Sequence, residues 1–248
     1  MSGYGDFSAV YDGLTDNVEY EKRAKYIHHL LKKGGISDGL MLDLACGTGR
    51  LSCEMAKLGY EVIGVDASGE MLSIAMNNAN ENGVDILFLC QEMQNLDLFG
   101  TIRSAICTLD SINHLTDPED VKKTFAGVSL FTEPGGLFVF DVNTPYKHRE
   151  ILANNTFVYD TDEVYCVWQN TLEPDTDTVA IALDIFEQED DGAYFRTQES
   201  FCERAYSVQD LSDWLKEAGF DEINIYDELT EDEPKADSQR LFIIARKK

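Results

Sequence analysis

The first half of the chain alternates between two hydrophobic patterns, which predict strands and helices in turn. Short continuous apolar runs are typical of strands that are buried on both faces of a parallel sheet. The stretches between them carry apolar residues every three or four positions, as an amphipathic helix does. We therefore expect strands at 40–45, 61–66, 85–90, 104–109 and 136–142, and helices at 50–58, 68–83 and 117–131. Strands that alternate with helices form right-handed βαβ units, so this half of the chain predicts a parallel sheet.

A different pattern runs from about residue 155 to 205, where apolar and polar residues alternate one by one. A period of two is typical of strands with one buried and one exposed face. Acidic, turn-rich segments at 173–178 and 189–192 separate the runs, as hairpin loops would. We therefore expect an antiparallel β insertion. The first pattern then returns, with a helix over 207–220 and two last strands over 222–228 and 240–246.

Net charge limits the class of partner. The 248 residues carry a formal net charge of −26, and a polyanion repels nucleic-acid backbones unless it keeps a local basic patch. The densest basic clusters, 22–25 and 32–33, are short and are typical of a solvated helix face. We therefore expect no nucleic-acid partner.

Targeting signals and metal-binding motifs are not evident in the sequence. No stretch approaches the roughly 18 uninterrupted apolar residues of a membrane helix, and the N-terminus lacks a basic segment followed by an apolar one. We therefore expect a cytoplasmic protein with no membrane partner. The six cysteines form no C-x-x-C pair, and the four histidines show no metal-ligand spacing, so we expect neither a disulfide framework nor a metal site.

Candidate chemistry begins where the first strand runs into the glycine corner "DLACGTG" (43–49). In doubly wound sheets, ligands bind beyond the carboxyl ends of the strands. A dinucleotide fingerprint would require a third glycine, and Ser52 stands at that position. Asp43 would also repel a pyrophosphate, whereas it would attract a ligand that carries an ammonium and a sulfonium. The corner therefore favours S-adenosylmethionine, with small residues allowing close approach to the backbone.

Later strand ends supply further candidate contacts to that ligand. Asp66 ends the second strand, 19 residues after Gly47, where a carboxylate can accept hydrogen bonds from both ribose hydroxyls. Ala67 is small enough to lie beside the adenine. Glu92 can accept from the adenine amine, and the backbone N–H of Met93 can donate to the ring. Leu109, at the end of the fourth strand, would also face the ligand.

The sequence resembles the class I S-adenosylmethionine-dependent methyltransferases, especially a bacterial group of small proteins that carries a β insertion. The matching segments span nearly the whole chain: "FSAVYDGL", "LDLACGTGR", "VIGVDASGEML", "CQEMQNLDL", "CTLDSINHL", "EPGGLFVFDVNTP", "ERAYSVQDLSDWLKEAGF" and "RLFIIARK". The first motif together with Asp66 and Glu92 is specific for the cofactor, and none of the segments is specific for the methyl acceptor.

The resemblance implies an α/β fold with a Rossmann-like, seven-stranded, mostly parallel sheet whose last strand is antiparallel, plus the antiparallel β insertion. The implied parts are an N-terminal helical cap (1–35), a cofactor-binding domain (36–149 and 205–248) and an insertion over the active site (150–204). The expected cofactor-binding residues are Tyr11, Asp43, Ala45, Cys46, Gly47, Gly49, Asp66, Ala67, Met71, Gln91, Glu92, Met93 and Leu109. Tyr11 has an alternative role as a packing residue of the N-terminal helix. Arg23 is either a partner of the cofactor carboxylate or, as we favour, a solvated helix charge.

Methyl transfer is an in-line displacement with a good leaving group, so the protein mainly aligns and desolvates the reactants. A base is needed when the nucleophile carries a proton. His114 is a candidate base because its ordinary pKa lies near neutrality, although a histidine in such a loop is more often structural. Asp110 and Asn113 are candidates for positioning the acceptor, and Asp141 and Asn143 are further polar groups of this region.

The insertion carries side chains that would cover or bind the acceptor. Most of its aromatic residues are expected to pack within the sheet, and some to cover an apolar acceptor: Tyr159, Tyr165, Trp168, Phe186, Tyr194, Phe195 and Phe201. Arg196 and Arg204, with Tyr206, lie near the return to the main sheet. Either arginine has two possible roles, binding an acceptor carboxylate or forming a structural ion pair, and the ion pair is the favoured interpretation.

Three functions compete for this sequence. The first is a methyltransferase that acts on an O or N atom of a small molecule. The second is a nicotinamide- or nucleotide-dependent enzyme, which predicts a third glycine and a phosphate site without acids, and both expectations fail. The third is a non-catalytic sensor or partner module that binds S-adenosylmethionine, which turnover with a panel of acceptors would separate from the first. A protein or tRNA acceptor is a less favoured variant of the first function.

Overall fold

The structure, a computed structural model, describes residues 18–161, 164–173, 175–188 and 191–248. No helix within these ranges is long and apolar enough to cross a membrane. The helices are α2 (Tyr20–Lys33), α3 (Arg50–Lys57), α4 (Gly69–Asn82), α5 (Pro118–Phe131) and α6 (Val208–Glu217), with short helical turns η1 (Met93–Asn95), η2 (Ser111–His114) and η3 (Lys147–Leu152). The strands are β1 (Gly39–Leu44), β2 (Tyr60–Asp66), β3 (Leu87–Cys90), β4 (Ile102–Cys107), β5 (Thr132–Asn143), β6 (Thr156–Asp160), β7 (Val164–Glu173), β8 (Thr178–Gln188), β9 (Tyr194–Arg204), β10 (Phe220–Asp227) and β11 (Arg240–Lys247).

The central sheet has seven strands in the order β10-β11-β5-β4-β1-β2-β3. The pairs among β1 to β5 are parallel, whereas β11 is antiparallel to both of its neighbours, β5 and β10. The strand order reverses between β1 and β4, and this is the point at which open α/β sheets bind ligands. The predicted fold class, with an antiparallel last strand, is therefore confirmed.

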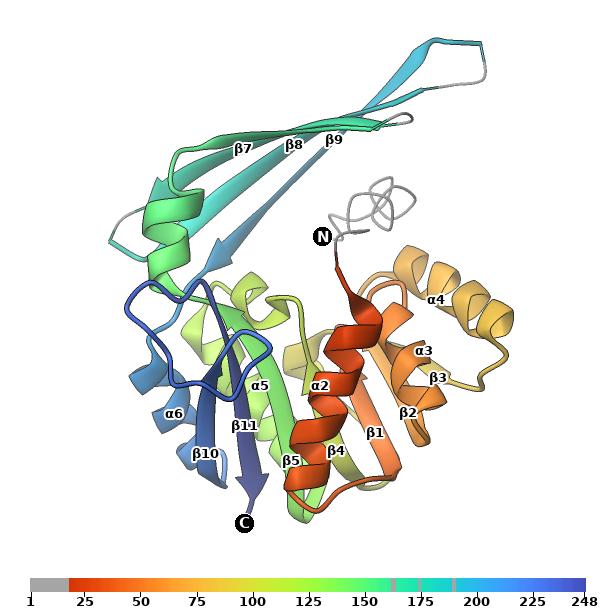
Figure 1. The fold of residues 1–248 in the computed structure, drawn as a ribbon, viewed down its shortest axis with the longest axis vertical. Coiled ribbons are helices and arrows are strands. Elements are labelled where there is room, and N and C mark those ends of the chain that lie inside the picture. The colour runs from red at the N-terminus through yellow and green to blue at the C-terminus, as the bar shows by residue number, and fades with distance from the viewer. Residues whose placement is uncertain (1–17, 162–163, 174, 189–190) are drawn as a thin grey trace.

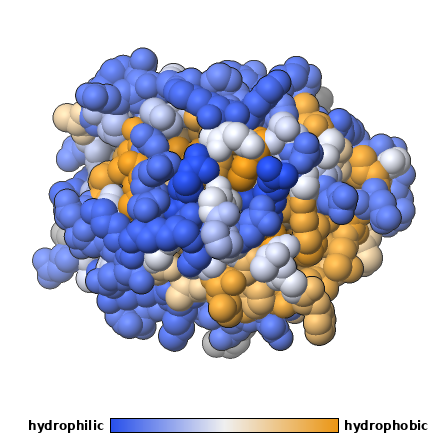
Figure 2. All heavy atoms as spheres, turned by 90° about the horizontal axis from the view of Figure 1, so that it is seen from below, coloured by the Kyte–Doolittle hydropathy of each residue, from blue (hydrophilic) through white to orange (hydrophobic). Residues whose placement is uncertain are grey.

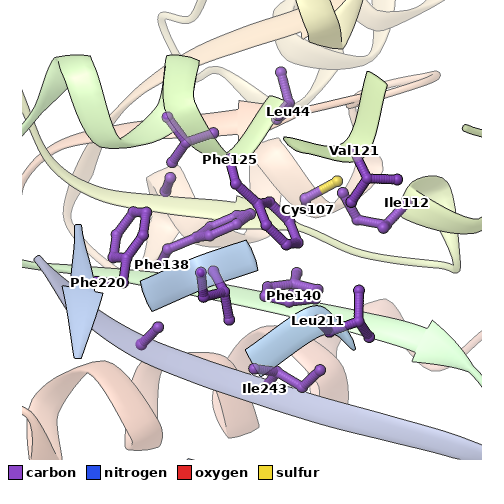
Figure 3. Close-up of a cluster of buried hydrophobic side chains, with 14 of the residues drawn as sticks. Leu44, Cys107, Ile112, Val121, Phe125, Phe138, Phe140, Leu211, Phe220 and Ile243 are labelled. Atoms are coloured by element: carbon purple, nitrogen blue, oxygen red, sulfur yellow. The ribbon is translucent and has the colours of Figure 1, made fainter. Parts of the chain in front are cut away.

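Helices cover both faces of this sheet (Figure 1), and a hydrophobic core lies on each face. Successive residues of a strand point to opposite faces, so Phe138 and Phe140 of β5 belong to the core under α5 and α6, whereas Val139 belongs to the core under α2 and α3. Figure 3 shows Phe138 and Phe140 packed with Phe125 of α5. Burial on both faces explains why the parallel strands are continuous apolar runs.

The segment predicted as a β insertion forms a separate antiparallel sheet in the order β6-β7-β8-β9. Figure 1 shows this sheet standing beyond the carboxyl ends of the parallel strands, and η3 connects it to β5. Its buried face is built on Val179, Ile181, Leu183 and Ile185, which alternate along β8. The two predicted hairpin loops join β7 to β8 and β8 to β9. The period of two therefore predicted the local structure correctly.

The end of the molecule away from this sheet carries mostly hydrophilic side chains, with apolar side chains gathered along one side (Figure 2). Large apolar side chains with high exposure in the described chain include Leu87, Phe99 and Leu130. A cavity lies at the opposite end of the strands.

Candidate active site

A cavity of about 480 Å³ opens at the carboxyl ends of the central strands, where the strand order reverses. Its wall combines residues of the glycine corner, of the loops after β2, β3 and β4, of α2 and of strand β9. The lining residues are Tyr20, Asp43, Ala45, Cys46, Gly47, Thr48, Arg50, Leu51, Asp66, Ala67, Ser68, Met71, Glu92, Met93, Gln94, Thr108, Leu109, Ser111, His114, Leu115, Ser200 and Phe201. Cavities of this size are typical of small-molecule sites.

The two glycines of the corner have different structural roles. Both have left-handed backbone conformations, with φ of 53° at Gly47 and 72° at Gly49. A Cβ on Gly47 would meet no atom within 4 Å, so the backbone there lies bare beside open space. A Cβ on Gly49 would lie 2.9 Å from the Cβ of Ala75, because Gly49 is the N-cap of α3 where that helix meets α4. Gly47 therefore allows a ligand to approach, whereas Gly49 allows two helices to pack.

Asp43 lies at the base of the cavity with 1% of its surface exposed. The hydroxyl of Ser52 donates to its Oδ2 at 2.5 Å. Burial raises the pKa of Asp43 to about 7, the Ser52 hydrogen bond opposes this shift, and the charge of Asp66 adds to it. Within the part of the chain that the structure describes, no cation is paired with this carboxyl. A buried acid that lacks a counter-charge suits a cationic ligand.

Asp66 connects the glycine corner to the loop after β2. Its Oδ2 accepts from the backbone N–H of Gly47 at 2.8 Å, and its Oδ1 accepts from that of Ser68 at 2.9 Å. Burial raises the pKa of Asp66, and these backbone donors oppose the shift. A carboxylate oxygen has two lone pairs, so each oxygen can accept a further hydrogen bond from a ligand hydroxyl.

The exposed carboxylate of Glu92 sits on the rim of the same cavity. Its Oε2 accepts from the side-chain amides of Asn95, at 2.8 Å, and Gln94, at 3.3 Å. These two bonds orient the carboxylate at the end of β3, beside Met93.

Loop residues after β4 complete the cavity, and Asp141 holds them in place. Leu109 and Asp110 are consecutive non-glycine residues with left-handed φ angles of 57° and 54°, a conformation that costs free energy. Their backbone N–H groups both donate to Asp141, at 3.0 and 2.8 Å. The fully buried carboxylate of Asp141 thus stabilises the turn that presents Leu109 and His114 to the cavity.

Arg23 is a partner of that carboxylate, which corrects the interpretation of Arg23 as a solvated helix charge. It is 6% exposed, and its guanidinium donates to Asp141 and to Glu228, each at 3.0 Å. Arg240 donates to Asp141 from the other side and to Asp110 at 2.7 Å. Burial raises the pKa of Asp110, but the charges of Arg240 and Lys147 and the Arg240 hydrogen bond together hold it below its usual range. No local sequence pattern indicates this cluster, because its members lie far apart along the chain.

His114 lines the cavity on the side of the insertion. Its ring lies 5.2 Å from the ring of Phe201, which also lines the cavity, and its Nε2 lies 3.8 Å from a carboxyl oxygen of Glu203. Burial lowers the pKa of His114, and the charges of Asp110 and Asp66 oppose the shift. The imidazole is therefore held toward its neutral, proton-accepting form.

The structure brings most of the predicted cofactor residues to one cavity. Ten of them are in its wall: Asp43, Ala45, Cys46, Gly47, Asp66, Ala67, Met71, Glu92, Met93 and Leu109. Gly49 and Gln91 are not among the lining residues; Gln91 instead bonds both backbone polar groups of Asp97 and shapes the loop. Tyr11 lies outside the described residues.

The other acceptor-side candidates have mainly structural contacts. Asn113 is fully buried, and its amide bonds the backbone of Asn143 and Arg204. Neither Asn113 nor Asp110 is among the described residues of the cavity wall. Arg196 forms an ion pair with Asp184, as the favoured interpretation expected.

Some wall residues were not among the sequence candidates. Thr48 and Arg50 are part of the first motif, so their position in the glycine corner could have indicated them. Tyr20, at the start of α2, and Ser200, on β9, reach the cavity through tertiary contacts between distant segments. Among the described residues no group of three or more acidic, cysteine or histidine side chains is arranged to hold a metal ion.

Comparisons with known proteins agree with this geometry. Residues 41–136 match a family described as "Methyltransferase domain". The chain is 34% identical over 98% of its length to YqeM of Bacillus subtilis (strain 168), which is covered to 97% and is named provisionally as a methyltransferase. It is 32% identical to an S-adenosylmethionine-dependent methyltransferase from Clostridium acetobutylicum ATCC 824, whose crystal structure superposes with a TM-score of 0.89 over 99% of both chains. The protein belongs to the class I S-adenosylmethionine-dependent methyltransferases.

Relatives with named acceptors are more distant. A glycine/sarcosine N-methyltransferase of Halorhodospira halochloris is 26% identical over 95% of this chain and 86% of its own length. A ubiquinone biosynthesis O-methyltransferase of Colwellia psychrerythraea is 31% identical over 55% of each chain. The protein is thus an enzyme that uses S-adenosylmethionine, and its relatives include both N- and O-methyltransferases.

Proposed function

We propose that this methyltransferase transfers the methyl group in line to an O or N atom of a small molecule held between the glycine corner and the β insertion. The observation that carries the proposal is the composition of the cavity wall. Asp43 and Asp66 line one side of it, and His114 and Phe201 line the side next to the insertion. One cavity therefore offers a site for the cofactor and a site for a second, smaller molecule.

The cofactor site is proposed from the chemistry of each group. Asp43 would face the positively charged methionine end, because it is a buried acid that pairs with no cation of the described residues. Bare backbone at Gly47 would lie against the ligand. Asp66 would accept from the ribose hydroxyls, Glu92 from the adenine amine, and the N–H of Met93 would donate to the ring.

S-adenosylmethionine, when bound, supplies an electrophilic methyl group attached to a good leaving group. The contribution of the chain is to align the acceptor, exclude water and receive a proton where the nucleophile carries one. His114 is the proposed proton acceptor because it lines the cavity and is held toward its neutral form.

The contribution of the insertion to the cavity wall supports a small acceptor. Strand β9 contributes Ser200 and Phe201 to the cavity, so the insertion covers the acceptor side.

We extend this proposal to the organisation of the chain, in which 1–35 acts as a cap, 36–149 and 205–248 bind the cofactor and 150–204 covers the active site. The net charge of −26 disfavours a nucleic-acid acceptor. The relatives include both N- and O-methyltransferases, which is why both atom types are proposed.

Calorimetric titration tests the cofactor site. We expect micromolar binding of S-adenosylmethionine and S-adenosylhomocysteine and no binding of NAD. Asp66→Ala should weaken adenosyl-ligand binding roughly 10- to 100-fold through loss of charged hydrogen bonds. Asp85→Ala, which removes an exposed acid, is the matched control and should bind normally. NAD binding, or undiminished binding by Asp66→Ala, would contradict the assignment.

The acceptor class needs a separate measurement. The protein would be incubated with methyl-labelled cofactor and cell extract divided into small-molecule and macromolecular fractions. We expect the label to appear in the small-molecule fraction. Label confined to the macromolecules would overturn the proposed substrate class and leave the cofactor assignment intact.

A further inference from the structure

Glu203 is a buried acid that reaches the active site from the insertion. It lies on β9 with 4% of its surface exposed. Alternate residues of a strand share a face, so Phe201 and Glu203 point the same way. Phe201 packs against the ring of His114, and the Oε1 of Glu203 lies 3.8 Å from the Nε2 of that ring. A single strand therefore supplies both a wall and a carboxyl group to this imidazole.

A second histidine faces the other oxygen of the same carboxyl. The Nε2 of His148 lies 3.8 Å from Oε2 of Glu203 and makes no hydrogen bond, although His148 is fully buried. Its Nδ1 lies 2.8 Å from the carbonyl oxygen of Asp177, which requires Nδ1 to be the donor. The Nε2 of neutral His148 is then a buried acceptor. The amide of Asn143 also donates to Oε2 at 3.3 Å.

We propose that Glu203 is a positioning residue that acts through His114: it directs the Nε2 of the imidazole toward itself and balances the positive charge formed when His114 takes the proton of the methyl acceptor. The inference rests on the proposed function of His114. As the acceptor atom bonds to the methyl carbon and the methyl–sulfur bond breaks, the proton of the acceptor passes to Nδ1 of His114. The bonding electrons remain with sulfur, and Glu203 in its ionised form pairs with the resulting imidazolium.

The charges around Glu203 set the pH at which this form exists. Burial raises its pKa to about 8, with Asp110 adding to the shift, while Lys147, the Asn143 hydrogen bond and Arg240 oppose it. Burial lowers the pKa of both His114 and His148. Near neutral pH the carboxyl of Glu203 thus keeps its proton, and its O–H faces the acceptor Nε2 of His148. Above about pH 8 the carboxyl ionises, and the carboxylate then favours an N–H donor on His114.

Nuclear magnetic resonance of the four imidazoles tests the pairing without a known acceptor. The full chain would be labelled at histidine and titrated, with His114→Gln and His148→Gln variants used for assignment. We expect the signals of His114 and His148 to share a pH-dependent inflection between about pH 7 and 9. Nitrogen shifts at pH 9 should place the proton of neutral His114 on Nε2. His28, on α2, serves as an internal control and should lack that inflection, because burial lowers its pKa.

Glu203→Gln keeps the size of the side chain and removes its titration. It should abolish the shared inflection and reduce the Nε2–H form of His114. Glu173→Gln removes an exposed acid from the same sheet and should leave both features unchanged. An inflection that survives in Glu203→Gln would overturn the proposal. If that variant does not fold, a wild-type titration without a shared inflection would overturn it equally. Neither outcome affects the calorimetric test of the cofactor site.

Discussion

At the scale of single residues, two acids near the glycine corner are chemically different. Asp66 is bonded to two backbone N–H groups, which favour its ionised form, whereas Asp43 has one hydroxyl donor and is almost fully buried. The sequence identified both residues and predicted that a carboxylate at Asp43 attracts a cationic ligand. Burial modifies this attraction, because the pKa of about 7 makes the charge of Asp43 depend on pH.

The affinity for S-adenosylmethionine should therefore rise with pH. Asp43 loses its proton between pH 6 and 7.5, so binding should be roughly tenfold tighter at the higher pH. Asp43→Asn should bind more weakly at pH 7.5 and lose this dependence, whereas Asp85→Asn, the exposed control, should keep it. Calorimetry at several pH values checks both statements, and a flat profile in the wild type would contradict them.

The raised pKa of Asp43 should affect stability in the opposite direction: affinity rises with pH, whereas the contribution of Asp43 to stability falls. The pKa of Asp43 is raised on folding, from about 4 to about 7, so its neutral form stabilises the fold at low pH and that stability is lost as pH rises through 7. Asp43→Asn stays neutral. The melting temperature of Asp43→Asn minus that of the wild type should therefore be larger at pH 8 than at pH 5. Thermal denaturation measures this difference. An equal difference at both pH values would contradict the raised pKa.

At the scale of elements, the hydrophobic period predicted nearly every helix and strand of the described chain. The β4 boundary differed: the run 104–109 predicted a strand that includes Leu109, but β4 ends at Cys107. The backbone leaves the strand because Asp141 accepts from the N–H groups of Leu109 and Asp110. Asp141 lies on another strand, so a local pattern contains no information about this turn.

The corner between β1 and α3 offers a paired test. Gly49→Ala should destabilise the protein by about 2 kcal/mol, because a left-handed alanine would also overlap the Cβ of Ala75. Gly47→Ala should cost only about 1 kcal/mol of stability, since nothing lies within 4 Å of the new Cβ. It should nevertheless weaken cofactor binding roughly tenfold by filling space beside the ligand. Urea denaturation and calorimetry measure the two effects, and the reverse assignment would show that Gly49 faces the ligand.

At the scale of the whole molecule, a buried ion-pair cluster joins segments that are distant in sequence. Arg23 of α2 and Arg240 of β11 meet Asp141 of β5, and Glu228 closes the cluster near the surface. The cluster fixes the first described helix against the sheet and, through Asp141, supports the turn that carries His114. Stability and the geometry of the active site are therefore linked.

Arg23→Met should destabilise the protein by about 3 kcal/mol, because removing one partner leaves the buried Asp141 with less compensation. Lys22→Met is the matched control. Lys22 pairs with Glu19 on the surface, so its loss should change stability by less than about 1 kcal/mol. Denaturant titration measures both. Equal effects of the two substitutions would mean that Arg23 behaves as a surface charge after all.

The sequence alone determined the order of strands and helices, the β insertion and the residues of the cofactor corner. It did so because each of these depends on local properties: hydrophobic period, glycine conformation and the position of an acid at a strand end. Tertiary structure alone decided which residues from distant segments meet at the cavity. The role of Arg23, the protonation of Asp43 and the approach of Glu203 to His114 depend on burial and on neighbours far along the chain, which no local pattern records.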